Sequence, residues 1–170
     1  ATLTCAGPCD IECPGGADDE GAFDPDCGQD VPDPDGGCNN LPDNPATFFP
    51  VTPGTPICGT GFTDGSTRDT DWFELVIAEP TTLTMMLETE FTAVFGLIET
   101  CGDPDCDLAS GVNPALTVGP CETDPEARTI ETDCLPPGTY WLFVGADFAS
   151  PAECGREYVL TDINRDGQVT

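Results

Sequence analysis

The sequence predicts an all-β fold, an antiparallel β-sandwich. From about Ala46, short runs rich in Val, Ile, Leu, Thr, Phe and Tyr alternate with Gly, Pro and Asp, a pattern typical of strands joined by turns. Several of these runs show the period of two that a half-buried strand requires. No stretch shows a sustained helical period or the residues that cap helices.

Nine segments are expected to be strands, and we find no internal repeat of domain size among them. In chain order they are ATFFPV (46–51), ICGTGF (57–62), DWFELVIAE (71–79), TTLTMMLETE (81–90), AVFGLIET (93–100), ALTVGP (115–120), ARTIETD (127–133), GTYWLFVGA (138–146) and REYVLTD (156–162).

Two of these segments define which side chains face the core. In DWFELVIAE, the side chains of Phe73, Leu75 and Ile77 share one face of the strand. Trp72 begins the opposite face. In TTLTMMLETE, one face of the strand is apolar and consists of Leu83, Met85 and Leu87.

The first 45 residues differ in composition from the rest of the chain. They contain eleven acids, seven Pro, seven Gly and five Cys, but no basic residue and few large apolar side chains. Such a segment buries too little apolar surface to offset its ordering entropy. Its order therefore requires disulfides, bound cations, the rest of the chain or a neighbouring molecule. We divide the chain into an irregular, disulfide-rich, acidic arm (1–45), a β-sandwich (46–161) and a partial calcium-binding loop (162–170).

The charge balance excludes several classes of partner. The chain has 32 acidic and 4 basic residues, and its formal net charge is -28. Nucleic-acid binding depends on Lys and Arg that neutralise phosphates, and an anionic membrane surface would repel this chain. Membrane insertion is not expected, because no long apolar run is present. Cations are the natural partners of so many carboxylates, and calcium prefers oxygen ligands.

The cysteines indicate an oxidising compartment. The chain has eleven Cys and no His, so a disulfide framework is favoured over a zinc site or a Cys–His catalytic pair. We expect a secreted protein, extracellular or on the cell surface, and the opening ATLT fits a mature secreted chain. Because the count is odd, one Cys is either free or bonded to another chain, and both alternatives stay open.

The tail DINRDGQVT contains the first half of a calcium loop. Asp162, Asn164 and Asp166 take the first, third and fifth ligand positions, and Gly167 provides the sharp turn. The backbone carbonyl of Gln168 would be the next ligand. The acid expected at the twelfth position is missing, so it comes from elsewhere in the chain, from another chain, or from nowhere. The alternative is a solvated Asp-Gly turn.

Three further groups of acids are candidates for cation sites. The first group is Asp103, Asp105 and Asp107, and the second is Asp30, Asp33 and Asp35, which precede Gly36-Gly37. For both groups, the alternative is an acidic loop that binds no ion. The third group, Asp69 and Asp71, precedes Trp72. It is either a cation site at the entry to a strand or a capping pair that holds the turn at Arg68, and we favour the capping pair.

Catalysis is not expected. No His is present to act as the base for a serine nucleophile, and no Lys is present to complete a phosphate-binding loop. Among the many carboxylates, no pair suited to glycoside hydrolysis stands out.

Several stretches resemble a known family. RDTDWFELVIAEPTTLTM (from Arg68), CLPPGTYWLFVGADF (from Cys134) and CGREYVLT resemble the bacterial pre-peptidase C-terminal type of secreted β-sandwich. CPGGADDEG, DGGCNNLP and ICGTGF resemble a Cys-rich extension found beside it, and DINRDGQV resembles the opening of a dockerin-type calcium repeat. The resemblance implies a sandwich of jelly-roll or immunoglobulin-like shape that is a non-catalytic appendage of secreted enzymes and surface proteins. It also suggests the disulfides Cys13–Cys27, Cys38–Cys58 and Cys134–Cys154.

Two functional hypotheses follow. In the first, the chain is a calcium-binding structural subunit that assembles with itself, head to tail, into an extracellular filament through its arm or a donated strand, with ATLT and ATFFPV as candidate donors. In the second, it is a calcium-stabilised accessory module of a larger secreted protein, and it binds glycans through aromatic side chains. The aromatic candidates lie inside strand patterns and are Trp72, Tyr140, Trp141 and Tyr158.

Overall fold

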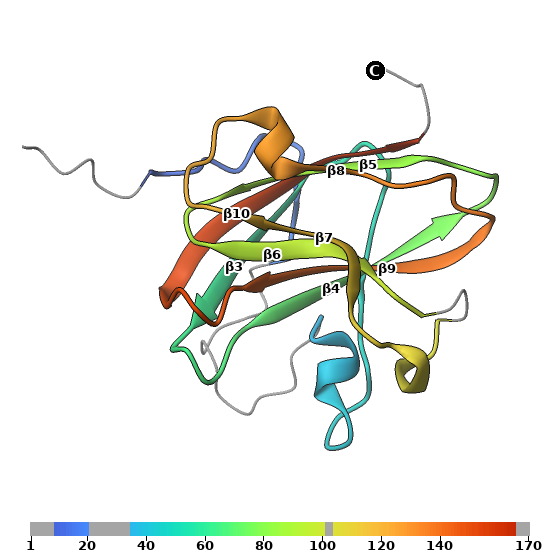
Figure 1. The fold of residues 1–170 in the computed structure, drawn as a ribbon, viewed down its shortest axis with the longest axis horizontal. Helices are drawn as coiled ribbons and strands as arrows, with labels where there is room; N and C mark the ends of the chain where they lie inside the picture. Colours follow the sequence, from blue (N-terminus) through green and yellow to red (C-terminus); the bar gives the residue numbers. More distant parts are fainter. Residues whose placement is uncertain (1–8, 21–34, 101–103, 166–170) are drawn as a thin grey trace, which may run out of the picture.

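Two five-stranded sheets pack face to face in the computed structural model of the chain (Figure 1). The structure describes residues 9–20, 35–100 and 104–165. Within these ranges no α-helix occurs, and only short 3-10 helices interrupt the strands. The predicted all-β sandwich is therefore confirmed.

Each sheet collects strands from distant parts of the sequence. The first sheet has the order β1 (Asp18–Asp19), β3 (Ile57–Thr63), β10 (Ala152–Arg165), β5 (Leu83–Thr89) and β8 (Thr129–Glu131). The second sheet has the order β2 (Phe49–Pro50), β4 (Thr70–Ile77), β9 (Gly138–Ala146), β6 (Ala93–Ile98) and β7 (Val112–Val118).

The two shortest strands, β1 and β2, lie at corresponding edges of the sandwich. β1 pairs in parallel with β3, and β2 pairs in parallel with β4, whereas the other strand pairs are antiparallel. β3 and β4 are joined by a tight turn in which the Asp64 carboxylate accepts hydrogen bonds from the N–H groups of Ser66 and Thr67. The arm and the segment after it thus extend both sheets at the edge where β3 and β4 meet.

The main core fills the space between the sheets. Phe73, Leu75 and Ile77 of β4 face it, as the alternation predicts. From the other sheet, the apolar face of β5 meets them, and its predicted members are buried as well: Leu83, Met85 and Leu87. Burial of these side chains is the main favourable contribution to folding.

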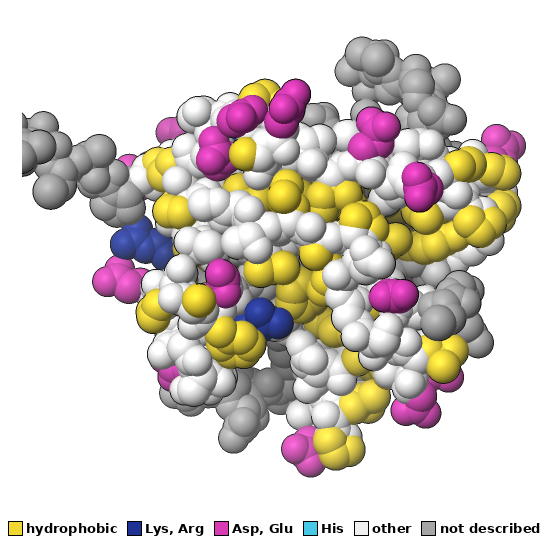
Figure 2. Space-filling view, viewed as in Figure 1, with side chains coloured by type: hydrophobic (Ala, Val, Ile, Leu, Met, Phe, Trp, Pro, Cys, Tyr) yellow, Lys and Arg dark blue, Asp and Glu magenta, His cyan; other side chains and the backbone are white. Residues whose placement is uncertain are grey.

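A second apolar cluster covers the outer face of the second sheet. It contains Trp72, Trp141 and Phe143, and Phe48 stacks on Trp141 with ring centroids 4.4 Å apart. Figure 2 shows a band of hydrophobic side chains across the middle of the molecule, with acidic side chains mainly towards its outline. The disulfide Cys38–Cys106 packs against this cluster and joins two 3-10 helices, η2 (Gly37–Asn40) and η3 (Cys106–Leu108).

The disulfides differ from those that the family resemblance suggests. Cys13 bonds Cys58, Cys38 bonds Cys106, and Cys134 is free and exposed, so all three suggested pairs are wrong. Cys154 is disulfide-bonded as well. The physical reason is that the arm has few apolar side chains of its own. Its described cysteines, Cys9, Cys13 and Cys38, are therefore joined to residues of the sandwich region.

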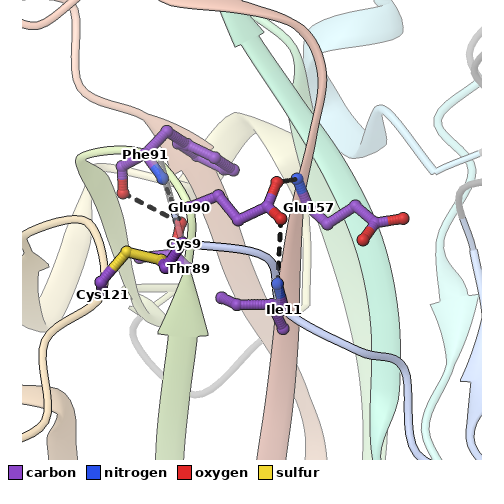
Figure 3. Close-up of a disulfide and its surroundings, with 7 residues drawn as sticks. All are labelled: Cys9, Ile11, Thr89, Glu90, Phe91, Cys121 and Glu157. Carbon is purple, nitrogen blue, oxygen red and sulfur yellow. Dashed lines mark hydrogen bonds between the residues drawn. A yellow bond between two sulfur atoms is a disulfide. The ribbon is translucent and has the colours of Figure 1, made fainter. Parts of the chain in front are cut away.

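The same pattern holds at the start of the described arm (Figure 3). Cys9 bonds Cys121, and the Glu90 carboxylate accepts hydrogen bonds from the Ile11 N–H at 3.0 Å and the Glu157 N–H at 2.9 Å. One carboxylate thus links the arm to β10 beside the disulfide. The arm is held by covalent and polar contacts, which is what its composition requires.

Candidate cation site

Three buried carboxylates meet at the edge of the sandwich between β3 and β4. Glu20 directly follows β1, Asp35 precedes η2, and Asp71 lies in β4; their exposed fractions are 1%, 3% and 2%. One carboxylate oxygen from each lies within 4.8 Å of the others. Asp69, which is 8% exposed, adds a fourth carboxylate near Asp71. We call Glu20, Asp35, Asp69 and Asp71 the carboxylate cluster.

Backbone contacts place the two ligands that come from the arm. The Glu20 N–H donates to the Cys58 carbonyl at 3.0 Å, and the Glu20 Oε1 accepts from the Thr60 N–H at 2.9 Å. The Asp35 carbonyl accepts from the Trp72 N–H at 2.7 Å. The arm therefore lies along β3 on one side of the edge and along β4 on the other.

Tyr158 of β10 lies at the centre of the cluster. Its side chain is 1% exposed, and its hydroxyl lies 2.5 Å from Asp71 Oδ2 and 3.2 Å from Glu20 Oε1. The other oxygen of Asp71, Oδ1, has no hydrogen-bond partner among the residues that the structure describes. A buried carboxylate oxygen without a partner is costly, so this atom is a candidate ligand atom for a cation.

The electrostatics of the cluster are unfavourable while all of its carboxylates are charged. Burial, and then the charges of Glu20, Asp69 and Asp35, raise the pKa of Asp71 well above its usual value. Burial and the charge of Asp71 likewise raise the pKa of Tyr158. The ion pairs among the described residues do not involve the cluster: Arg128 pairs with Glu88, and Arg156 pairs with Glu153.

The chemistry of the donors suits a hard cation. The cluster offers only carboxylate oxygens and a phenol, whereas zinc in proteins is bound mainly by sulfur and nitrogen. Calcium binds oxygen at about 2.3–2.6 Å, so two ligands on opposite sides of one ion are about 5 Å apart. The spacing of Glu20, Asp35 and Asp71, within 4.8 Å, matches that geometry.

The structure separates the other candidates that the sequence offers. Asp35 is in the cluster, whereas Asp30 and Asp33 lie outside the described residues, as does Asp103. Asp105 and Asp107 are exposed, and the Asp105 carboxylate accepts from the Asp107 N–H at the start of η3. This contact is the capping role that an acidic loop performs without an ion.

The tail begins as a strand. β10 continues to Arg165, with Asn164 opposite Thr84, so Asp162 and Asn164 belong to the first sheet. Asp166 and Gln168 lie outside the described residues. Calcium binding by the tail stays a prediction.

Glu20 is the member of the carboxylate cluster that the sequence did not reveal. It lies in an acidic stretch with many other carboxylates, and only the pairing of β1 with β3 brings it to the cluster. Asp69 and Asp71 are candidates in the sequence as well, since they precede Trp72 at the entry to a strand, although the sequence favours a capping pair there. In the structure, the Asp64 carboxylate accepts hydrogen bonds in the turn before β4.

The aromatic residues considered for glycan binding are mostly covered. Trp72, Trp141 and Tyr158 are each buried, and Trp141 lies beneath the ring of Phe48. Tyr140 is partly buried, and its hydroxyl donates to the Pro136 carbonyl. None of the three buried rings presents a face on which a sugar could stack.

In the presence of a chelator, we expect the free energy of unfolding to fall as the pH rises above the usual Asp pKa of 3.8. A raised pKa in the folded state means that the folded chain holds a proton that the unfolded chain releases, so this stability is greatest at low pH and is lost towards the raised pKa. Urea unfolding between about pH 4 and 8 measures the slope. Asp71→Asn should flatten it, and an equal slope in that variant would contradict the assignment.

No family model and no curated protein matches the chain. Among solved structures, the chain is similar to PliG of Aeromonas hydrophila, a periplasmic inhibitor of g-type lysozyme, with 17% identity and a TM-score of 0.45 over 68% of this chain and 95% of that one. It is also similar to the pre-peptidase C-terminal domain of a collagenase from Bacillus anthracis, with 16% identity and a TM-score of 0.45 over 69% of this chain and 96% of that one. That domain is of the type that the sequence motifs resemble.

Proposed function

We propose that this chain is a non-catalytic, calcium-binding structural module of an extracellular protein. The observation that carries the proposal is the carboxylate cluster, in which the buried Oδ1 atom of Asp71 has no hydrogen-bond partner among the described residues. A divalent ion there would neutralise carboxylates that otherwise repel one another in a poorly solvated site. The ion would also join the arm, through Glu20 and Asp35, to β4.

The setting of the cluster supports a structural role rather than a catalytic one. All four carboxylates are buried at the edge of the sandwich, so a bound ion would be enclosed by the chain itself. Catalytic metal sites keep a position open for water or substrate.

The disulfides fit an oxidising compartment, and no helix in the described part of the chain is long and apolar enough to cross a membrane.

Calorimetric titration of chelator-treated protein with calcium tests this function. We expect a saturable site in the wild-type chain and its loss in Asp71→Asn, because the substitution removes a charged ligand but keeps the shape of the side chain. Asp105→Asn is the matched control, since that exposed carboxylate caps η3 and is expected to leave the site intact. Absence of binding in the wild-type chain would overturn the proposal.

Assembly into a filament is a second, wider proposal. β7 lies at the edge of its sheet, and none of the described strands pairs with its outer side. A seven-residue edge strand is a template for a strand donated by another copy. ATFFPV already pairs within its own chain, through β2, and ATLT lies outside the described residues.

Particle size, measured by light scattering and negative-stain imaging with millimolar calcium and then with excess chelator, tests assembly. Polymers that shorten on chelation would support a filament subunit. A monomer in both conditions would overturn the filament and leave the calcium-binding module in place.

A further inference from the structure

β3 carries two glycines, Gly59 and Gly61, that both leave room for side chains of the interior. A Cβ atom at Gly59 would lie well inside 3.0 Å of Glu20 Oε1 and of the Tyr158 hydroxyl and ring. The nearest atoms to a Cβ atom at Gly61 would be those of the Phe91 ring, also inside 3.0 Å. The two positions thus present the same steric problem, but only Gly59 adjoins the carboxylate cluster.

The arm contacts β3 at the residues directly before and directly after Gly59. Cys13 is bonded to Cys58, whose carbonyl accepts from the Glu20 N–H at 3.0 Å. The Glu20 side chain then passes Gly59, and its Oε1 accepts from the Thr60 N–H at 2.9 Å. The residue before Gly59 therefore binds the arm covalently, and the residue after it orients the Glu20 carboxylate.

We propose that Gly59 is a positioning residue of the cation site, because its missing side chain is the space in which the Glu20 carboxylate and the Tyr158 hydroxyl meet. This inference rests on the proposed calcium site. The ring of Tyr158 is held in the core and moves little, whereas the Glu20 carboxylate ends a flexible side chain. A methyl group at position 59 therefore displaces Glu20 first and removes one ligand from the ion.

Terbium, a luminescent ion of similar size and preference for oxygen ligands, provides the test. Its emission is sensitised by nearby aromatic rings such as Tyr158, and its decay in H2O and D2O reports how many waters it binds. We expect Gly59→Ala to weaken binding at least tenfold, the scale seen when groups that orient metal ligands are removed. The bound terbium should gain water in place of the Glu20 carboxylate.

Gly61→Ala is the control in the same strand, since the atoms nearest to its added Cβ belong to the ring of Phe91 and not to a carboxylate of the cluster. It should leave affinity and bound water unchanged whatever it does to thermal stability. Glu20→Asp adds no atom to β3, so it serves even where Gly59→Ala does not fold. Its shorter side chain should withdraw the carboxylate and give the same gain of water.

The double variant Glu20→Asp/Gly59→Ala decides whether Gly59 acts through Glu20. We expect little further loss beyond Glu20→Asp, because the displaced carboxylate is already absent. Wild-type affinity in Gly59→Ala, an equal loss in Gly61→Ala, wild-type affinity in Glu20→Asp, or additive losses in the double variant would each overturn the inference. Failure of the wild-type chain to bind terbium or calcium would instead overturn the proposed function.

Discussion

Saturating calcium should raise the free energy of unfolding of the wild-type chain by about 3 kcal/mol at a hundred times the dissociation constant. For a domain of this size, each kcal/mol corresponds to about 2–4 °C in melting temperature, so the expected rise is about 6–12 °C. The cause is that the ion binds a cluster that exists only in the folded chain, where Glu20, Asp35 and Asp71 come together. Thermal unfolding with calcium and with excess chelator measures the shift.

Asp71→Asn should melt at the same temperature in calcium and in chelator. In chelator it should be no less stable than the wild-type chain, because it removes one of the buried like charges that raise the energy of the folded state. Asp105→Asn should retain the full calcium response, since Asp105 is exposed and caps η3 and is not a member of the carboxylate cluster. A calcium response of equal size in Asp71→Asn would contradict the assigned site.

Loss of the Cys38–Cys106 disulfide should destabilise the chain by about 4 kcal/mol, the value expected for a loop that closes over 68 residues of separation. The bond holds η2 and η3 against the aromatic cluster on the outer face of the second sheet. In the Cys38→Ala/Cys106→Ala variant we expect an earlier urea transition. The emission of Trp72 and Trp141 should shift to the red as their cover loosens.

Cys134→Ala is the control for this variant, because Cys134 is free and exposed and its loss should leave the transition within about 0.5 kcal/mol of the wild type. If the double alanine variant unfolded at the wild-type urea concentration with unshifted emission, η2 and η3 would not depend on the bond for their position.

Most strands could be predicted because their signals are local. β9 spans the same residues as its predicted segment, GTYWLFVGA, and the buried faces of β4 and β5 follow the alternation of their side chains. β10 begins earlier than expected, at Ala152. Its first residues include Gly155, which has a positive φ of 85°, and the register shifts between Ala152 and Arg156. A bulge of this kind breaks the period of two on which the prediction depends.

The disulfides could not be predicted, because pairing depends on which strands lie side by side. Cys13 meets Cys58 only because β1 adds to β3, and Cys38 meets Cys106 only because η2 and η3 cover the same face. Nothing in the spacing of the cysteines along the sequence encodes these contacts.

By itself, the sequence determined the sandwich, and it predicts that the arm needs support beyond its own apolar side chains and that the chain prefers cations, since composition and alternation act locally or on the whole chain. Only the tertiary structure decided where a cation would bind. Glu20, Asp35 and Asp71 belong to three separate segments, and in the sequence each resembles the many other acids of the chain. Burial at the edge between β3 and β4 distinguishes them, because carboxylates repel strongly only where water is excluded.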